Sequence, residues 1–179
     1  MTEVGTIYGG ALYDLAADEG LEEEILAQLQ VLNQSFAQEP DFLKLLSAHH
    51  VPKEERCNIL QESFGGKVHP YVLNFLKILT EKDYICQFSA CYDAFRGRYN
   101  EAHHILPVTA VTAVALNENQ AARLVQKLEE RTGASIELTN RVDTHVLGGI
   151  RLEFDGKSMD DTLTHRLEAI RDLLNHTIL

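Results

Sequence analysis

The chain has 179 residues, of which 45% are hydrophobic, enough to build one large or two small packed domains and too many for a disordered protein. Its formal net charge is −11, from 27 acidic and 16 basic residues, so a nucleic-acid backbone would be repelled on average. The longest apolar run, Ile105 to Leu116, contains Pro107 and is too short to span a bilayer, and the N-terminus lacks the pattern of a targeting signal. We therefore expect a soluble, intracellular protein that neither inserts into a membrane nor binds nucleic acid.

Up to about residue 102, apolar residues recur at helical spacing in six segments. Proline suits the first turn of a helix and glycine often follows its last residue, so Pro40, Pro52 and Pro70 mark three starts and Gly65 marks an end. The apolar stripes of the first, second and sixth segments are Tyr8, Ala11, Leu12 and Leu15, then Leu21, Ile25, Leu29, Leu32 and Phe36, and finally Ile85, Phe88, Tyr92, Phe95 and Tyr99. Because only a few residues connect the segments, we predict antiparallel neighbours in a helical bundle.

The fifth segment, which begins at Pro70, is apolar over more than one face. Its apolar residues are Val72, Leu73, Phe75, Leu76 and Leu79. A helix that is apolar over so wide an arc has either several neighbours in its own chain or a neighbour from another chain. The sequence leaves both alternatives open.

The pattern changes after Pro107, where the stretch VTAVTAVAL is rich in β-branched residues and predicts a strand. Asn117 can cap a helix that Gly133 ends, and a second strand runs from Ile136 to Val142. A last helix is predicted to begin at the capping residues Asp160-Asp161-Thr162. Its apolar stripe is Leu163, Leu167, Ile170 and Leu174.

These segments predict a mainly α protein with a small α+β part. We expect an N-terminal six-helix bundle over residues 1–104 and a small C-terminal α/β domain over residues 105–179. The sequence has no internal repeat, low-complexity tract or long linker, so the sixth helix should run almost directly into the second domain.

The tripeptide Gly156-Lys157-Ser158 is the one hint of a nucleotide site. A phosphate-binding loop, however, needs glycine where Arg151 stands. The preceding residues alternate between apolar and polar as in a half-buried strand, and Asp155-Gly156 favours a two-residue hairpin turn. That hairpin would place Leu152 opposite Met159. We predict a hairpin rather than a nucleotide site.

No cluster of titratable side chains predicts catalysis or metal binding. Cys57, Cys86 and Cys91 lack metal-binding spacing, and we expect them to be buried free thiols. Adjacent residues on a helix point about 100° apart, so the pairs His49-His50 and His103-His104 are expected at the surface rather than on a metal. We expect no catalytic, cofactor-binding or metal-binding residues.

Four stretches of the sequence nevertheless resemble one known family. The first three are IYGGALYDLA, LLSAHHVPKEERCNIL and VLNFLKILTEKDY. The fourth, VDTHVLGGIRLEFDGKSMDDTLTHRL, is similar to the family's C-terminal signature. Together they resemble, from end to end, the delta subunit of F-type ATP synthases, called the oligomycin-sensitivity-conferring protein in mitochondria. Two positions depart from the family pattern: Gly9 replaces a usual alanine, and Asp160-Asp161-Thr162 replaces Asp-Gly-Ser.

The resemblance implies a non-catalytic stator subunit without cofactors. Its helical domain would hold N-terminal helices of the alpha subunits on the catalytic head, and its C-terminal domain would hold the b subunits of the peripheral stalk. Rotor torque would then drive ATP synthesis coupled to proton translocation, at the cytoplasmic face of the bacterial cell membrane. The alternatives are a stand-alone helical adaptor and a nucleotide-binding enzyme.

The resemblance also implies where the alpha subunit binds. It places a groove between the first and fifth helices, lined by Tyr8, Ala11, Leu12, Leu15, Leu73, Leu76 and Leu79. The other interpretation is that these residues face only the core of their own chain. If the groove is open to water, Leu76→Glu should abolish binding of the catalytic head without unfolding the free subunit.

Overall fold

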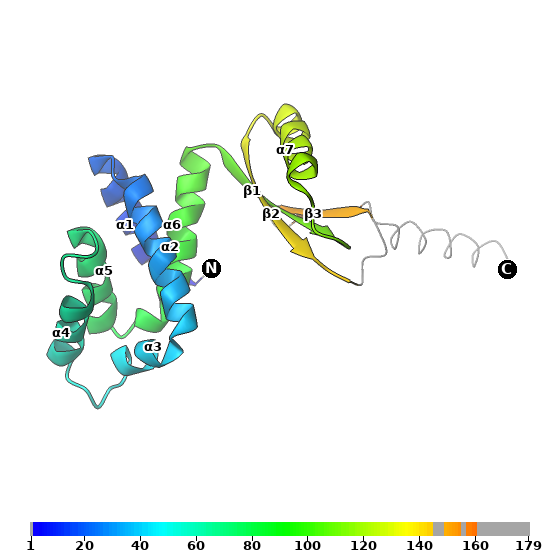
Figure 1. Cartoon of the computed structure of the whole chain (residues 1–179). Coiled ribbons are helices and arrows are strands. Elements are labelled where there is room, and N and C mark those ends of the chain that lie inside the picture. Colours follow the sequence, from blue (N-terminus) through cyan, green and yellow to red (C-terminus); the bar gives the residue numbers. More distant parts are fainter. Residues whose placement is uncertain (1, 145–148, 155–156, 161–179) are drawn as a thin grey trace, which may run out of the picture. The chain divides into compact units, whose positions relative to one another are not determined.

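The computed structural model describes residues 2–144, 149–154 and 157–160 of the chain (Figure 1). The chain forms two compact units, Met1–Tyr99 and Asn100–Leu179, which we call the helical unit and the α/β unit. The fold is mainly helical with a small β part, as predicted.

The helical elements follow one another with short connections. In chain order they are α1 (Glu3–Glu19), α2 (Glu22–Gln38), α3 (Pro40–Leu46), α4 (Lys53–Phe64), α5 (Pro70–Glu81), the short 3-10 helix η1 (Ile85–Gln87) and α6 (Phe88–Ala102). Pro40 and Pro70 occupy the first turn of their helices, and Gly65 directly follows α4, as predicted. Pro52 lies one residue before α4 rather than within it, because its ψ of 144° is extended.

A continuous apolar core fills the helical unit. The predicted stripe of α2 is buried at Ile25, Leu29, Leu32 and Phe36. Helix α5 packs against α4, α2 and η1. These neighbours bury the apolar residues Val72, Phe75, Leu76 and Leu79 of α5. Neighbours within the chain therefore explain most of the wide apolar arc of this helix, while Leu73 is only half-buried.

Glycines allow α1 to lie directly against α6. A Cβ atom on Gly9 would come within 2.2 Å of the carbonyl oxygen of Cys91, and one on Gly5 within 2.7 Å of the carbonyl oxygen of Ala90. Such distances are far below a van der Waals contact, so no other residue fits at either position without a shift of the helices.

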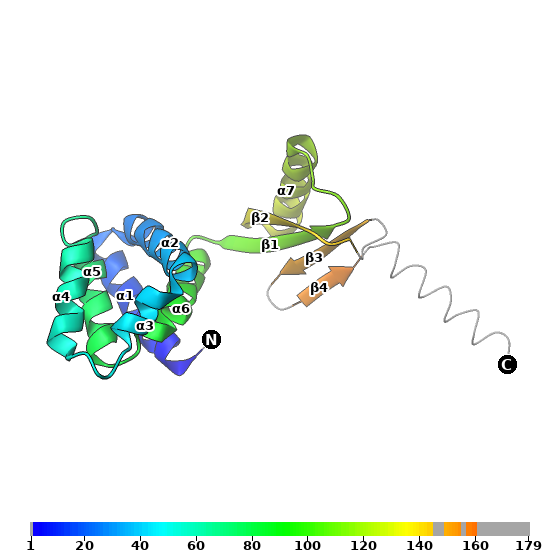
Figure 2. The same ribbon diagram turned by 60° about the horizontal axis from the view of Figure 1, so that its bottom comes forward.

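The α/β unit is built on a four-stranded sheet with the strand order β2-β1-β3-β4 (Figure 2). Its elements are β1 (Ile105–Thr112), α7 (Glu118–Thr132), β2 (Ser135–Val142), β3 (Ile150–Phe154) and β4 (Lys157–Asp160). Strand β1 pairs in parallel with β2, to which α7 connects it, and antiparallel with β3. In the β3–β4 hairpin Leu152 lies opposite Met159, as predicted, while the turn residues Asp155 and Gly156 lie outside the described residues.

Strand β1 begins and ends earlier than predicted. It includes Pro107, which cannot donate a backbone hydrogen bond, although a strand was expected only after this residue. Strand β3 pairs with β1 only from Thr109 to Thr112, so one side of β1 has no described partner strand at Pro107 and a missing donor is tolerated there. The strand ends where the hydroxyl of Thr112 donates to the carbonyl oxygen of Val114, 2.8 Å away, and bends the chain.

Helix α7 is delimited as predicted. At its start the side chain of Asn117 accepts a hydrogen bond from the backbone N–H of Gln120, and the side chain of Gln120 accepts one from the backbone N–H of Asn117. At its end Gly133 has a left-handed φ of 69°. None of the residues of α7 is fully buried. The predicted last helix, with Leu163 to Leu174, lies outside the described residues.

Candidate partner-binding surface

Helix α1 presents three different faces. Leu12 and Ala16 point into the core, and Gly5 and Gly9 lie against α6. The third face carries Ile7, Ala11 and Leu15, which we call the α1 stripe. Ile7 is 58% exposed and Leu15 is 41% exposed, and Ala11 between them is also exposed. An apolar row of this kind on a well-packed unit is typical of a surface that a partner covers.

The structure distributes the seven predicted groove residues over different environments. Ala11 and Leu15 belong to the exposed α1 stripe, while Tyr8 and Leu73 are half-buried. The other three residues are core residues of the chain itself: Leu12, at 5% exposed, and Leu76 and Leu79, both at 0%. The expectation that Leu76 is open to water in the free subunit is therefore wrong, because α4, α2 and η1 enclose α5.

Ile7 was missed by the sequence analysis. It precedes Ala11 and Leu15 by four and eight residues, so all three lie along one face of a straight helix. This spacing is visible in the sequence. The predicted stripe instead began at Tyr8, which borders the α1 stripe on the side of the core.

Tyr8 joins α1 to the turn that follows α5. Its ring meets that of Tyr84 edge to face, with ring centroids 5.8 Å apart and an interplanar angle of 63°. Both tyrosines are half-buried against the core. Pairs of this geometry contribute about 0.5–1.5 kcal/mol beyond the area they bury.

Asp83 forms that turn in an unusual backbone conformation. Its φ of 60° is left-handed, and glycine is the usual residue at this position after a helix. Its N–H donates to the carbonyl oxygen of Thr80 at 3.1 Å, and that of Tyr84 donates to Leu79 at 2.7 Å, which closes the end of α5. The left-handed conformation costs a non-glycine residue about 1–2 kcal/mol, so side-chain contacts must offset that cost.

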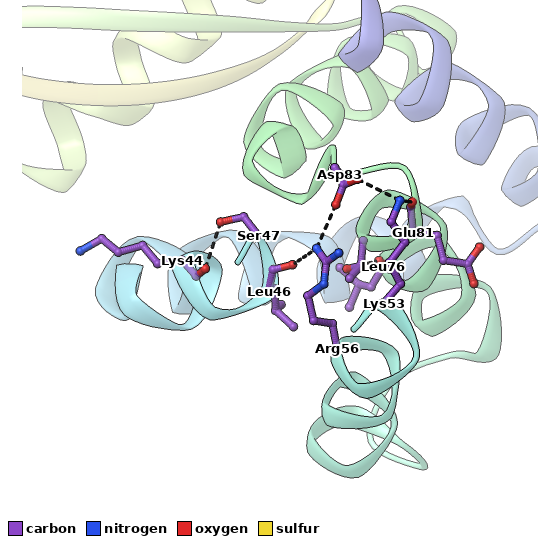
Figure 3. A network of polar contacts seen from close by, with 9 residues as sticks. Lys44, Leu46, Ser47, Lys53, Arg56, Leu76, Glu81 and Asp83 are labelled. Carbon is purple, nitrogen blue, oxygen red and sulfur yellow. Dashed lines mark hydrogen bonds and ion pairs between the residues drawn. The ribbon is translucent and has the colours of Figure 1, made fainter. Parts of the chain in front are cut away.

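The carboxylate of Asp83 binds two cationic side chains (Figure 3). Arg56 Nη1 lies 3.0 Å from Asp83 Oδ1, and Lys53 Nζ lies 2.9 Å from Oδ2. The hydrogen bonds from Lys53 and then Arg56 hold the pKa of the Asp83 carboxyl below its ordinary value. Asp83 therefore stays ionised over the whole neutral range.

Arg56 connects this turn to α3. Its side chain is 2% exposed, and the same Nη1 donates to the carbonyl oxygen of Leu46 at 2.8 Å. Leu46 is the last residue of α3, where carbonyl groups lack partners within the helix. Lys53 in turn donates to the carbonyl oxygen of Glu81, the last residue of α5. Arg56 and Lys53 thus tie α4 to the ends of α3 and α5.

The described residues offer little for catalysis. An open hollow of about 600 Å³ is lined by Lys53, Glu54, Cys57, Asn58, Glu81 and Lys82. Burial, followed by the charge of Glu81, raises the pKa of the Cys57 thiol, so this thiol is not an activated nucleophile at neutral pH. Within residues 2–144, 149–154 and 157–160, no three His, Cys, Asp or Glu side chains are grouped to hold a metal ion.

The cysteines and histidines differ in how well they match expectation. Cys91 is buried and Cys57 is half-buried, but Cys86 is exposed, contrary to prediction. It lies in η1 beside Ile85, which is fully buried and takes the inward position of this short turn. All three thiols are free, and the two histidine pairs are exposed, as predicted.

The α/β unit presents a charged face on its sheet. Val111 pairs with Arg141 on one side and Arg151 on the other, so the three side chains share a face. Glu153 accepts from Arg141 Nη2 at 3.1 Å and from Arg151 Nε at 3.2 Å. On this face two arginines and one glutamate pair beside the buried Val111.

No helix in the described part of the chain is long and apolar enough to cross a membrane.

Comparisons with known proteins agree over most of the chain. The family model described as ATP synthase delta (OSCP) subunit matches residues 4–174. A protein of Lactobacillus johnsonii named ATP synthase subunit delta is 33% identical over 173 residues, which cover 96% of this chain and 94% of the relative. A protein of the same name from Gloeobacter violaceus is 30% identical over 170 residues, which cover 94% and 92%.

A solved structure has a similar fold. It is a chain of the Toxoplasma gondii mitochondrial ATP synthase hexamer, determined by cryo-electron microscopy, with a TM-score of 0.76 and 16% sequence identity. The match covers 97% of this chain and 98% of the other.

Proposed function

Because the chain belongs to the ATP synthase delta (OSCP) subunit family, we propose that it links the catalytic head of an F-type ATP synthase to the peripheral stalk. It is a non-catalytic structural subunit of the stator, with the alpha subunits and the stalk b subunits as its partners. The observation that carries this conclusion is the family match over residues 4–174, which spans both units.

Its mechanism is mechanical. A turning rotor would drag the catalytic head with it unless a stationary link held the head against that torque. Such a link needs interfaces that dissociate slowly, and large apolar contacts suit this purpose. In this role the chain supports ATP synthesis driven by proton translocation and is a peripheral part of the membrane-bound complex, with the cytoplasmic face of a bacterial cell membrane as its proposed location.

The helical unit is proposed to act as the six-helix bundle that holds an N-terminal helix of an alpha subunit. The exposed α1 stripe supports this assignment, because it leaves apolar side chains uncovered on a unit that has filled its own core. Of the predicted groove residues, Tyr8, Ala11, Leu15 and Leu73 have surface available for a partner, and Ile7 joins them. An amphipathic helix fits such a surface, since it buries its apolar face in a groove.

The α/β unit is proposed to hold the b subunits. This unit, whose residues 161–179 lie outside the described residues, corresponds to the part of the chain expected to bind the stalk. The division of the chain into two compact units supports separate binding tasks.

A reconstitution experiment tests both assignments. Full-length protein is mixed with catalytic head lacking this subunit and, separately, with the soluble part of the b subunits, and the bound fractions are measured. We expect Ile7→Glu to weaken head binding by two to four orders of magnitude, because an uncompensated buried charge costs about 3–5 kcal/mol. Binding of the b subunits should be unchanged.

Val31→Glu is the matched control, because Val31 is 62% exposed on α2 and lies outside the α1 stripe. Equal loss of head binding in both variants, or none in either, would reject the α1 stripe as the contact. Failure of the parent protein to bind either partner would favour a stand-alone adaptor. Stoichiometric ATP binding that Lys157→Ala abolishes would favour the nucleotide-binding alternative.

A further inference from the structure

We propose that Asp83 is a positioning residue for the partner-binding surface. Its carboxylate, held by Lys53 and Arg56, fixes the turn that places Tyr84 against Tyr8 beside the α1 stripe. This inference rests on the proposed function, since it concerns the surface assigned to the alpha subunit. Nothing in the family resemblance assigns a role to Asp83.

The backbone of the turn explains why the side chain matters. Asp83 has a φ of 60°, a conformation that glycine adopts without steric cost. The turn needs only a left-handed residue to close the end of α5 through its two backbone hydrogen bonds. The carboxylate adds what glycine cannot, namely contacts to two cations on another helix.

Lys53 and Arg56 are held in place by further contacts besides those to Asp83. Arg56 is enclosed by the core and also donates to the end of α3, so its guanidinium has little freedom to move (Figure 3). Lys53 binds the Asp83 carboxylate and the carbonyl oxygen of Glu81 together. The carboxylate is therefore held from two sides, which restricts the φ and ψ angles of the turn.

The position of Asp83 decides the direction of the next side chain. Tyr84 follows directly, its N–H is bound to Leu79, and its ring stands edge-on to that of Tyr8. Tyr8 neighbours Ile7 in the sequence and borders the α1 stripe. A tyrosine that is already held in place loses less side-chain freedom when a partner binds. The ion pairs of Asp83 thus help to fix the rings of Tyr84 and Tyr8, and through them the edge of the α1 stripe.

The test is a double-mutant cycle on the full-length protein. The probe is catalytic head purified without this subunit, and the variants are Asp83→Gly, Tyr84→Ala and the two combined. Asp83→Gly keeps a residue that accepts positive φ and removes the side chain that carries the carboxylate. We expect each single variant to bind the head about two- to tenfold more weakly, as for loss of one aromatic pair. The combined variant should bind no more weakly than Tyr84→Ala alone.

A second readout concerns the free subunit. We expect the nuclear Overhauser effect between the rings of Tyr8 and Tyr84 to be lost in Asp83→Gly. Asp41→Asn is the control, because Asp41 forms an exposed ion pair with Lys44 at 2.7 Å and should change neither readout. If Asp83→Gly does not fold, Asp83→Asn takes its place, with a smaller loss expected in the same direction.

The outcomes separate this inference from the proposed function. Parent-like head binding by Asp83→Gly, effects that multiply in the combined variant, or a persistent contact between the two rings would each overturn the positioning role. A parent protein that does not bind the head would instead reject the proposed function, while the contact between the rings would still decide whether Asp83 positions Tyr84.

Discussion

Each helix from α1 to α6 buries at least one side chain, whereas α7 buries none completely. In the helical unit the helices cover one another on several sides. The buried apolar residues described in the α/β unit instead belong to the sheet: Val108, Ala110, Val111 and Ile136. Four apolar residues of α7 are only half-buried, namely Ala121, Leu124, Val125 and Leu128.

This difference shows how each unit can bind a partner. The helical unit has filled its core, so an exposed apolar residue such as Ile7 is available to another chain at little cost to its own fold. In the α/β unit the half-buried apolar side chains of α7 contribute to the fold and are also partly exposed to solvent. A partner should therefore bind the helical unit with little change in the packing of that unit. A partner of the α/β unit should cover apolar side chains on which its fold depends, and should therefore also stabilise that unit.

The largest expected effect comes from a charge in the filled core. Leu76→Glu should lower the free energy of unfolding by about 3–5 kcal/mol, because the carboxylate would be buried without a partner. Urea denaturation followed by circular dichroism measures this loss. Ile7→Glu, on the exposed stripe, should change it by about 0.5 kcal/mol or less. Equal losses in the two variants would mean that Leu76 is no more enclosed than Ile7.

The same truncation in each unit tests the comparison directly. Leu29→Ala in α2 should lower the free energy of unfolding by about 2–5 kcal/mol, because Leu29 is 1% exposed and truncating its side chain leaves a cavity. Leu124→Ala in α7 should cost about 1 kcal/mol, since a half-buried side chain has less burial to lose. Thermal unfolding of both variants under the same conditions measures the two losses of stability. An equal loss in Leu124→Ala and Leu29→Ala would contradict the difference between the two units.

A smaller effect is expected where two helices touch. Gly9→Ala should cost about 1–3 kcal/mol, because the new Cβ would overlap the backbone of Cys91. Gly10→Ala is the matched control: its closest neighbour, at 3.1 Å, is the guanidinium end of the exposed Arg98 side chain rather than backbone. The better helix propensity of alanine should make this variant neutral or more stable by up to about 1 kcal/mol. Chemical denaturation of the pair would show whether α1 can shift away from α6.

The smallest effect concerns pH. The pKa of Asp83 is lower in the folded protein than in the unfolded chain, so its stabilising contribution is present above the unfolded value of about 4 and is lost as the pH falls through the folded value. Parent protein should therefore unfold at a higher temperature than Asp83→Asn at pH 7, and the difference should shrink below about pH 4. A difference that is constant from pH 7 to pH 3 would show that the ion pairs contribute nothing.

Local signals in the sequence predicted most elements. Prolines, Asn117 and Gly133 located helix ends because they act through backbone geometry and short-range hydrogen bonds. The limits of β1 were missed because they depend on its pairing with β2, which runs from Ile105 to Thr112 and is a long-range property. For the same reason, helical spacing alone could not tell that Leu76 faces the core while Leu15 faces water.

The cluster around Asp83 was also beyond sequence reasoning. Lys53 and Arg56 precede it by about 30 residues and lie on a different helix, so only the folded chain brings the three charges together. Its sole local sign would have been an aspartate where a glycine is usual after a helix.

The exposure of Cys86 makes the protein ready for site-specific labelling. Burial raises the pKa of Cys91 to about 11, and Cys57 is also shielded, so a maleimide dye at neutral pH should react first with Cys86. Cys86 lies two residues after Tyr84. A fluorophore attached there, with no engineered cysteine, would report on the α5–η1 turn while the subunit works inside a rotating enzyme.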